Sequence, residues 1–361
     1  MYFSLCGWMR YYAAAGRKGI GQSWRVGTDC NSWDDFMLNT DAAAATASFA
    51  GPGAFNDVDE IGRATCHFGK VTSGIGIDCV ESKMRTQFSL IAVVGSPLLL
   101  SFDMSNWTKP WSGPPGSVDL VELYSNSEVL SVHQALTTDG QLTYSRLVGG
   151  PVTAGGVMPG TKKCDAADVT QRWKANGQGR IYSQAPGIED WCLRQGPMGN
   201  PKPAGPSQCG HAEYVWVSAC NTSCCGKQCE EYSWSHVNGT LRSGLATNPN
   251  PDGGGDPGTT LTVAPEGVPD TIMAEERFSH SDPRAPTQQV ELGDDGLLRV
   301  GASDMCLSAA APSNSSVFGR ELENGHAVLL INWSRQPNTV TCDSGCMAKM
   351  GYTDVVTVRD L

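Results

Sequence analysis

The chain has 361 residues, a length that fits two or more domains with sizeable cores. Its net charge of −11 argues against nucleic acids and anionic membranes as partners, because both require a basic surface. High contents of Gly (42) and Pro (21) favour strands and loops over long helices.

Residues 1 to 136 alternate between predicted strands and helices. The order is a strand at 2–6, a strand at 23–27, a helix over about 33–47 that Asn31 or Ser32 can cap, a strand at 48–51, a helix at 80–94, a nearly continuous apolar strand at 97–102, and helical turns at 118–124 and 128–133. Repeated βα units predict a parallel sheet. The polar residues follow the strands, where βα-barrel sites are built.

From about residue 137 the pattern changes to short strands and turns. Three stretches have a Gln or an aromatic residue, an Asn/Asp-Gly turn and then an apolar strand: 171–181, 234–241 and 288–298. They resemble the Gln-x-Trp repeats of ricin-type β-trefoil lectins, with the motif intact only at Gln171-Arg172-Trp173. Asn-Gly turns occur in any β domain, so an ordinary β region is the alternative. Residues 248–258 (NPNPDGGGDPG) are predicted to form a loop or linker.

Fourteen cysteines indicate an oxidising compartment. Four cluster at Cys220, Cys224, Cys225 and Cys229, and others form close pairs such as Cys66/Cys79 and Cys342/Cys346. Zinc ligation by the cluster is the alternative to disulfides, but no second spaced pair or suitably placed His supports it. Five Asn-x-Ser/Thr sequences agree with the compartment, at Asn106, Asn221, Asn238, Asn314 and Asn332.

The N-terminus does not resemble a signal peptide, and the longest apolar run, residues 90–100, is too short to span a bilayer. A cysteine-rich chain with N-glycosylation sequences is expected to pass through the secretory pathway. We therefore expect this sequence to be part of a longer secreted, vacuolar or lysosomal protein.

Two motifs carry the functional prediction. Trp24-Arg25-Val26-Gly27-Thr28-Asp29 places an Arg and an Asp four residues apart, and 50–59 is a Gly-Pro-Gly turn followed by Asn56-Asp57-Val58-Asp59. Together they resemble the retaining α-galactosidases of glycoside hydrolase family 27. The resemblance implies that 1–136 is the C-terminal half of a (β/α)8 barrel.

The resemblance also covers the tail of the chain. Residues 325–334 resemble strands of the C-terminal β-sandwich of the same family. The expected domains are therefore 1–136 as half of the catalytic barrel, 137–316 as a Cys-rich β region with a lectin-like insertion, and 317–361 as part of the β-sandwich.

The resemblance assigns roles to residues of both motifs. Retaining glycosidases use two carboxyl groups, one as nucleophile and one as general acid/base. Asp29 matches the acid/base, Arg25 matches a sugar-binding residue, and Asp59 matches a ligand for sugar hydroxyls. Asp57 is expected to hold the loop. A structural Arg25–Asp29 pair is the alternative.

A third group of expected substrate-binding residues is Cys6, Gly7 and Trp8. In the family, the residue after the Cys selects the substituent at C2 of the sugar, usually with Glu for galactosides and Ser for N-acetylgalactosaminides. Gly7 departs from both, so an α-N-acetylgalactosaminidase or a β-L-arabinopyranosidase remains an alternative specificity.

The family nucleophile lies in a Lys-x-Asp motif on an earlier strand, and only five residues precede Cys6. We therefore expect the nucleophile to lie outside this chain and the chain alone to be inactive. The expected function is hydrolysis of terminal α-linked galactose from oligosaccharides or glycoconjugates, with no cofactor, metal, nucleic acid or membrane insertion. The alternative is a carbohydrate-binding, lectin-like protein with a relic barrel.

Overall fold

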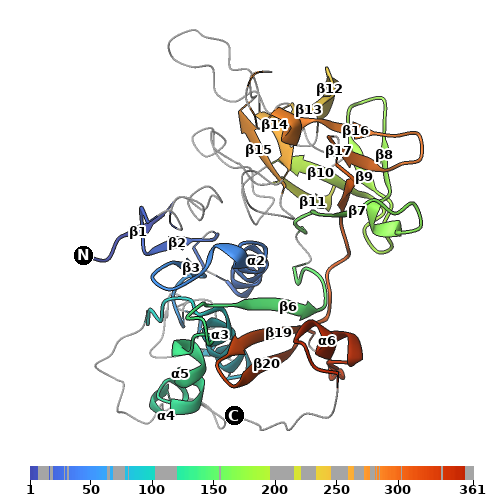
Figure 1. The fold of residues 1–361 in the computed structure, drawn as a ribbon. Helices are drawn as coiled ribbons and strands as arrows, with labels where there is room; N and C mark the ends of the chain where they lie inside the picture. The colour runs from blue at the N-terminus through green and yellow to red at the C-terminus, as the bar shows by residue number, and fades with distance from the viewer. Residues whose placement is uncertain are drawn as a thin grey trace, which may run out of the picture. The chain divides into compact units, whose positions relative to one another are not determined.

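A computed structural model describes most of the chain (Figure 1). The described residues are 1–6, 16, 19–27, 29–30, 32–62, 66–67, 78–79, 81–101, 120–153, 156–195, 215–220, 233–244, 259–263, 272–276, 281, 283, 285–301, 303–334 and 336–353. The chain divides into two compact units. Unit 1 comprises Met1–Val152 with Ser313–Leu361, and unit 2 comprises Thr153–Pro312.

Unit 1 begins with the predicted parallel sheet. Its strands are β1 (Ser4–Leu5), β2 (Ser23–Arg25) and β3 (Phe55–Asp57), in the order β1-β2-β3 with both pairs parallel. Beyond β3, Ile61 forms a parallel bridge with Leu100. The carboxyl ends of these strands therefore meet at one edge of the sheet.

The helices of unit 1 form where the sequence predicts them. They are α2 (Trp33–Ala45), α3 (Glu81–Val94), α4 (Leu120–Tyr124) and α5 (Ser127–Gln134). Ser32 caps α2 by accepting the Asp35 N–H, and Asn126 caps α5. Helix α3 packs against α5 and against the antiparallel sheet that follows.

The predicted strand at 48–51 was wrong, and the predicted strand at 97–102 is confirmed only in part. Ala47–Phe49 forms a 3-10 helix, and the strand comes later, as β3. Gly51 and Ala54 exchange two backbone hydrogen bonds of 2.8 and 2.9 Å, so a tight turn ends there and the chain extends only after it. In 97–101, the described part of the second segment, Leu100 forms only the single bridge to Ile61.

An antiparallel sheet completes unit 1. It consists of β20 (Gly325–Asn332), β19 (Ser315–Leu322) and β6 (Tyr144–Val148), followed by α6 (Ser344–Lys349). The buried Arg320 of β19 donates hydrogen bonds to the carbonyls of Ala92, His133 and Ala135, at the ends of α3 and α5. A cation at these helix C-termini is electrostatically favourable.

Unit 2 is built from short strands. They are β7 (Gly160–Lys163), β8 (Trp173–Ala175), β9 (Ile181–Ser183), β10 (Trp191–Gln195), β11 (Val215–Ala219), β12 (Trp234–Val237), β13 (Thr240–Ser243), β14 (Thr259–Val263), β15 (Ile272–Glu276), β16 (Val290–Leu292), β17 (Leu298–Val300) and β18 (Met305–Ser308). They pair in three four-stranded sheets: β11-β10-β9-β8, β12-β13-β14-β15 and β16-β17-β18-β7. The last of these joins the first strand of the unit to its final one.

Three hydrogen bonds repeat between the hairpins of unit 2. The first residue of each of β8, β12 and β16 donates its N–H to the turn glycine of another hairpin: Trp173 to Gly296 at 2.8 Å, Trp234 to Gly179 at 2.8 Å, and Val290 to Gly239 at 2.9 Å. These glycines have φ near +77°, a conformation that other residues rarely adopt. The three stretches that resemble one another in sequence therefore make equivalent contacts.

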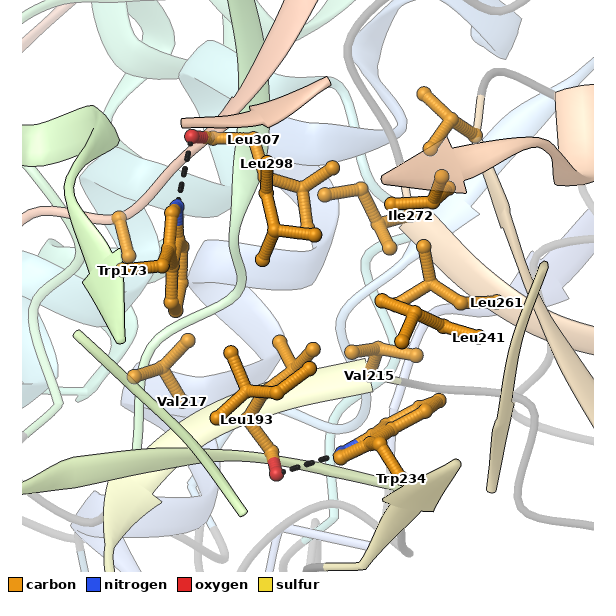
Figure 2. Packing of buried hydrophobic residues seen from close by; sticks show 14 of the residues in the cluster. Trp173, Leu193, Val215, Val217, Trp234, Leu241, Leu261, Ile272, Leu298 and Leu307 are labelled. Atoms are coloured by element: carbon orange, nitrogen blue, oxygen red, sulfur yellow. Dashed lines mark hydrogen bonds between the residues drawn. The ribbon is translucent and has the colours of Figure 1, made fainter. Parts of the chain in front are cut away.

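The core of unit 2 is continuous. Figure 2 shows Trp173 and Trp234 facing a shared cluster that includes Leu193, Leu261 and Leu307. The Trp173 indole donates to the Leu307 carbonyl at 3.0 Å, and the Trp234 indole donates to the Leu193 carbonyl at 2.9 Å (Figure 2). Both ring N–H groups are thus satisfied inside an apolar core.

Disulfides are present in both units. In unit 2, Cys164 bonds to Cys306 and Cys192 bonds to Cys220, and in unit 1 the predicted pair Cys342–Cys346 is confirmed. The predicted partners Cys66 and Cys79 lie directly opposite each other in the hairpin β4 (Cys66–His67) and β5 (Asp78–Cys79). The disulfide at Cys220 removes that thiolate from the zinc alternative; Cys224, Cys225 and Cys229 lie outside the described residues.

The boundaries of unit 2 lie inside the predicted β region. Strand β6 precedes unit 2 in the sequence and pairs with β19, which follows unit 2. Ser313 N donates to Pro151 O at 2.6 Å. The two ends of unit 2 are therefore adjacent, as they are when a domain is inserted between neighbouring strands. The assignment of 1–136, 137–316 and 317–361 to a half barrel, an insertion-bearing β region and a sandwich stays a prediction.

Candidate active site

Strands β2 and β3 bring the two sequence motifs together. Arg25 and Asp57 are register partners in the parallel pair, and Val26 N donates to Asp57 O at 3.0 Å. Both strands end here, so the residues that follow, Asp29 and Asp59, lie at the carboxyl edge of the sheet.

Arg25 contacts both of the predicted site carboxylates. Its Nη1 lies 3.3 Å from Asp29 Oδ1, and its Nη2 lies 2.8 Å from Asp59 Oδ2. The Asp29 side chain is 53% exposed and the Asp59 side chain only 7%. The Arg25–Asp59 pair is therefore the stronger contact, because exposed ion pairs contribute little.

Asp59 is held from several sides. Its φ of +84° is unusual for a residue other than glycine. Its N–H donates to Asp57 Oδ1 at 2.8 Å, and its Oδ2 also accepts the Cys30 N–H at 2.5 Å. Among the described residues, Asp59 Oδ1 has no hydrogen-bond partner, so this oxygen can accept from a ligand.

Burial shifts the pKa values of two groups behind the site. Burial raises the pKa of the Asp57 carboxyl, although the Asp59 N–H that it accepts acts in the opposite direction. Burial also raises the pKa of the Cys30 thiol well above its usual value, and the neighbouring Asp59 adds to the effect. Cys30 is therefore a neutral, buried thiol at neutral pH.

Asn56 fixes β3 against its neighbours. Its Oδ1 accepts from the Trp24 indole at 2.6 Å and from Thr46 Oγ1 at 3.2 Å. Its Nδ2 donates to Thr46 O at 2.9 Å and to Tyr144 Oη at 2.8 Å. Asn56 is fully buried and uses four hydrogen bonds, so it joins β2, β3, the end of α2 and β6.

The third predicted group is described only in part. Cys6 follows β1 at the same edge of the sheet and is an exposed free thiol, whereas Gly7 and Trp8 lie outside the described residues. The structure brings Arg25, Asp29 and Asp59 together. Sequence reasoning missed Cys30 and the supporting residues of α2, and the only available signal was their position next to the Arg-Asp motif.

Two other kinds of feature are absent from the described ranges. No group of three or more His, Cys, Asp or Glu residues there can hold a metal ion. No described helix is long and apolar enough to cross a membrane.

Comparison with known proteins identifies relatives of part of the chain. This chain is 26% identical to α-galactosidase 3 of Arabidopsis thaliana over 190 residues, and the match covers 49% of this chain and 38% of the relative. It is 32% identical to the α-galactosidase of Oryza sativa over 138 residues, covering 37% of this chain and 28% of the relative. Over part of its length, this chain is similar to curated α-galactosidases.

The chain spans about a third of the length of these curated α-galactosidases. No protein-family model matches it. Among solved structures, an α-galactosidase from Saccharomyces cerevisiae aligns at 18% identity with a TM-score of 0.30, covering 50% of this chain and 47% of that one. A family 27 β-L-arabinopyranosidase from Geobacillus stearothermophilus aligns at 17% identity, also with a TM-score of 0.30, covering 46% and 37%.

Proposed function

We propose that this chain supplies the acid/base side of a retaining glycosidase site that acts on terminal α-linked galactose. The observation that carries the proposal is Arg25, which contacts Asp29 and Asp59 at the carboxyl edge of the parallel sheet. The relationship to α-galactosidases supports the substrate class.

Each side chain has a role that fits its surroundings. Asp29 is the more exposed carboxyl and acts as general acid and then as general base at the leaving oxygen. Asp59 accepts a sugar hydroxyl with Oδ1, while Arg25 neutralises the site and donates to the sugar. Cys6 follows β1, and we assign it, together with Gly7 and Trp8, to recognition of the 2-substituent of the sugar.

The nucleophile is proposed to lie outside these 361 residues. The only Lys-x-Asp sequence in the chain, Lys163-Cys164-Asp165, belongs to unit 2, where Cys164 bonds to Cys306. Acid/base catalysis alone supplies about 10²–10⁴-fold, far below a glycosidase's total acceleration. The 361-residue chain should therefore not hydrolyse nitrophenyl α-galactoside, and turnover by this chain would contradict the proposal.

The role of Asp29 is testable once a second carboxylate is supplied. The residues that precede the matched region of the rice α-galactosidase can be fused before Met1 to supply it. In an active fusion, Asp29→Asn should abolish turnover of substrates with poor leaving groups and spare the first step on activated aryl galactosides, which need no proton. Equal loss on both substrate types would mean a structural Arg25–Asp29 pair.

The same fusion tests Gly7. Gly7→Glu should raise kcat/KM on α-galactosides, because a carboxylate can accept from the 2-hydroxyl, and lower it on N-acetylgalactosaminides. An unchanged ratio between the two sugars would show that Gly7 does not set specificity.

A second candidate function belongs to unit 2. The three four-stranded sheets and the repeated glycine contacts support a β-trefoil with lectin-like carbohydrate binding. Fold alone does not fix function, so this remains the alternative. Disulfides in both units support passage through the secretory pathway.

A further inference from the structure

A small buried cluster lies directly behind Asp59. Asn39 of α2 donates from Nδ2 to Cys30 Sγ at 3.0 Å and to the Val58 carbonyl at 3.3 Å. The Cys30 thiol in turn donates to the same Val58 carbonyl at 3.3 Å. All three residues are at most 2% exposed, so the cluster is closed to solvent.

This cluster contacts Asp59 in two ways, through the preceding peptide and through the N–H that binds its carboxylate. Val58 is the residue before Asp59, so its carbonyl belongs to the peptide that leads into the φ of +84°. Cys30 is the residue whose N–H binds Asp59 Oδ2 at 2.5 Å. One amide side chain on α2 thus ties the backbone before Asp59 to the residue that holds its carboxylate.

The chemistry of the cluster fits a fixed role. A protonated thiol donates to one acceptor and accepts weakly from one donor, and here both contacts are made. Burial raises the pKa of Cys30, which keeps the thiol protonated and unreactive. None of these contacts uses Asp59 Oδ1.

We propose that Asn39 and Cys30 are positioning residues for Asp59: they fix Oδ2 against Cys30 N and Arg25, and so leave Oδ1 oriented for a ligand hydroxyl. The choice of ligand rests on the proposed function, whereas the link between Asn39, Cys30 and Asp59 does not. Without the link, the strained backbone at Asp59 can relax and the carboxylate loses its fixed orientation.

The first test needs no sugar. Hydrogen exchange of the backbone amide at position 30 is measured by NMR in the wild-type chain, Asp59→Ala, Asn39→Ala and Cys30→Ala. Protection should disappear in Asp59→Ala, and should fall about tenfold relative to other amides of the sheet in the other two variants. Thr40→Val is the matched control, since Thr40 is equally buried on α2 but, among the described residues, its hydroxyl bonds only to Phe36 O, within the helix. It should leave the Cys30 ratio unchanged.

The second measurement is the galactose dissociation constant of the same proteins. Asn39→Ala and Cys30→Ala should weaken binding about tenfold, and Thr40→Val should not, even if it lowers the melting temperature equally. Unchanged Cys30 protection in Asn39→Ala overturns the proposal, as does equal weakening by the control. If the wild-type chain binds no galactose while Cys30 protection depends on Asn39, the proposed function fails and the positioning link stands.

Discussion

Replacing the buried Asn56 by Leu should destabilise unit 1 by about 2.5–7.5 kcal/mol. The Trp24 indole is fully buried and would lose its acceptor, which costs about 1–3 kcal/mol. Thr46 Oγ1, Thr46 O and Tyr144 Oη keep other partners, in Ala42, Phe49 and Ala43, so each of those lost bonds costs about 0.5–1.5 kcal/mol.

The assay is urea unfolding followed by hydrogen-exchange mass spectrometry. Peptides from β2, β3 and α2 should lose protection at lower urea in Asn56→Leu, and peptides from unit 2 serve as the internal reference, because its core is separate. A double-mutant cycle with Trp24→Phe isolates the main contact, since Asn56→Leu should cost about 1–2 kcal/mol less in that background. An equal cost in both backgrounds would mean that the Trp24–Asn56 hydrogen bond does not stabilise unit 1.

Three further predictions concern stability. Arg320→Met should destabilise unit 1 by about 3 kcal/mol, because three carbonyls at the ends of α3 and α5 lose their donor. Arg320→Lys should restore little of that stability. Full rescue by Lys, seen in thermal melts, would mean that these hydrogen bonds are not the source of the stability. Burial lowers the pKa of His133, so the contribution of the neutral His133 to the free energy of unfolding should be present above about pH 6.5. It should decline as the pH falls below that value, because the unfolded chain then binds the proton first. A His133→Gln variant should flatten that decline in pH-dependent urea titrations. Replacing Cys164 and Cys306 together by Ala should lower the stability of unit 2 by about 2–5 kcal/mol, measured by exchange of its peptides, and an unchanged unit 2 would show that the disulfide is dispensable.

Local signals made the helices predictable. Helix α2 begins after Ser32, whose side chain caps it, and α3 shows the spacing of apolar residues that a buried helical face requires. The parallel sheet followed from the alternation of strands and helices. These features depend on neighbours within a few residues, so a single sequence contains them.

The position of β3 could not be predicted in the same way. Asn56 is polar, yet it lies in a buried strand because its partners come from Trp24, Thr46 and the distant Tyr144. The motif identified Arg25, Asp29 and Asp59 as site candidates, but not how they meet. The hydrogen bond from the Cys30 N–H to Asp59 is a tertiary contact, and no local sequence pattern indicates it.

In unit 2, the first Gln-x-Trp stretch predicted one hairpin and its turn. The equivalence of the three hairpins depends on Trp173, Trp234 and Val290, which do not all carry the same side chain but each donate through the backbone N–H at the equivalent position. A backbone hydrogen bond does not require a particular side chain, so the repeat is clearer in the fold than in the sequence.

A galactose titration followed by NMR shows which unit binds the sugar. We predict that the backbone amides and side chains perturbed at the lowest galactose concentrations are those of Arg25, Asp29 and Asp59, and that Asp59→Asn removes these shifts. Perturbation confined to unit 2, around β8, β12 or β16, would mean that the Arg25–Asp59 site does not bind galactose and would favour a lectin-like function.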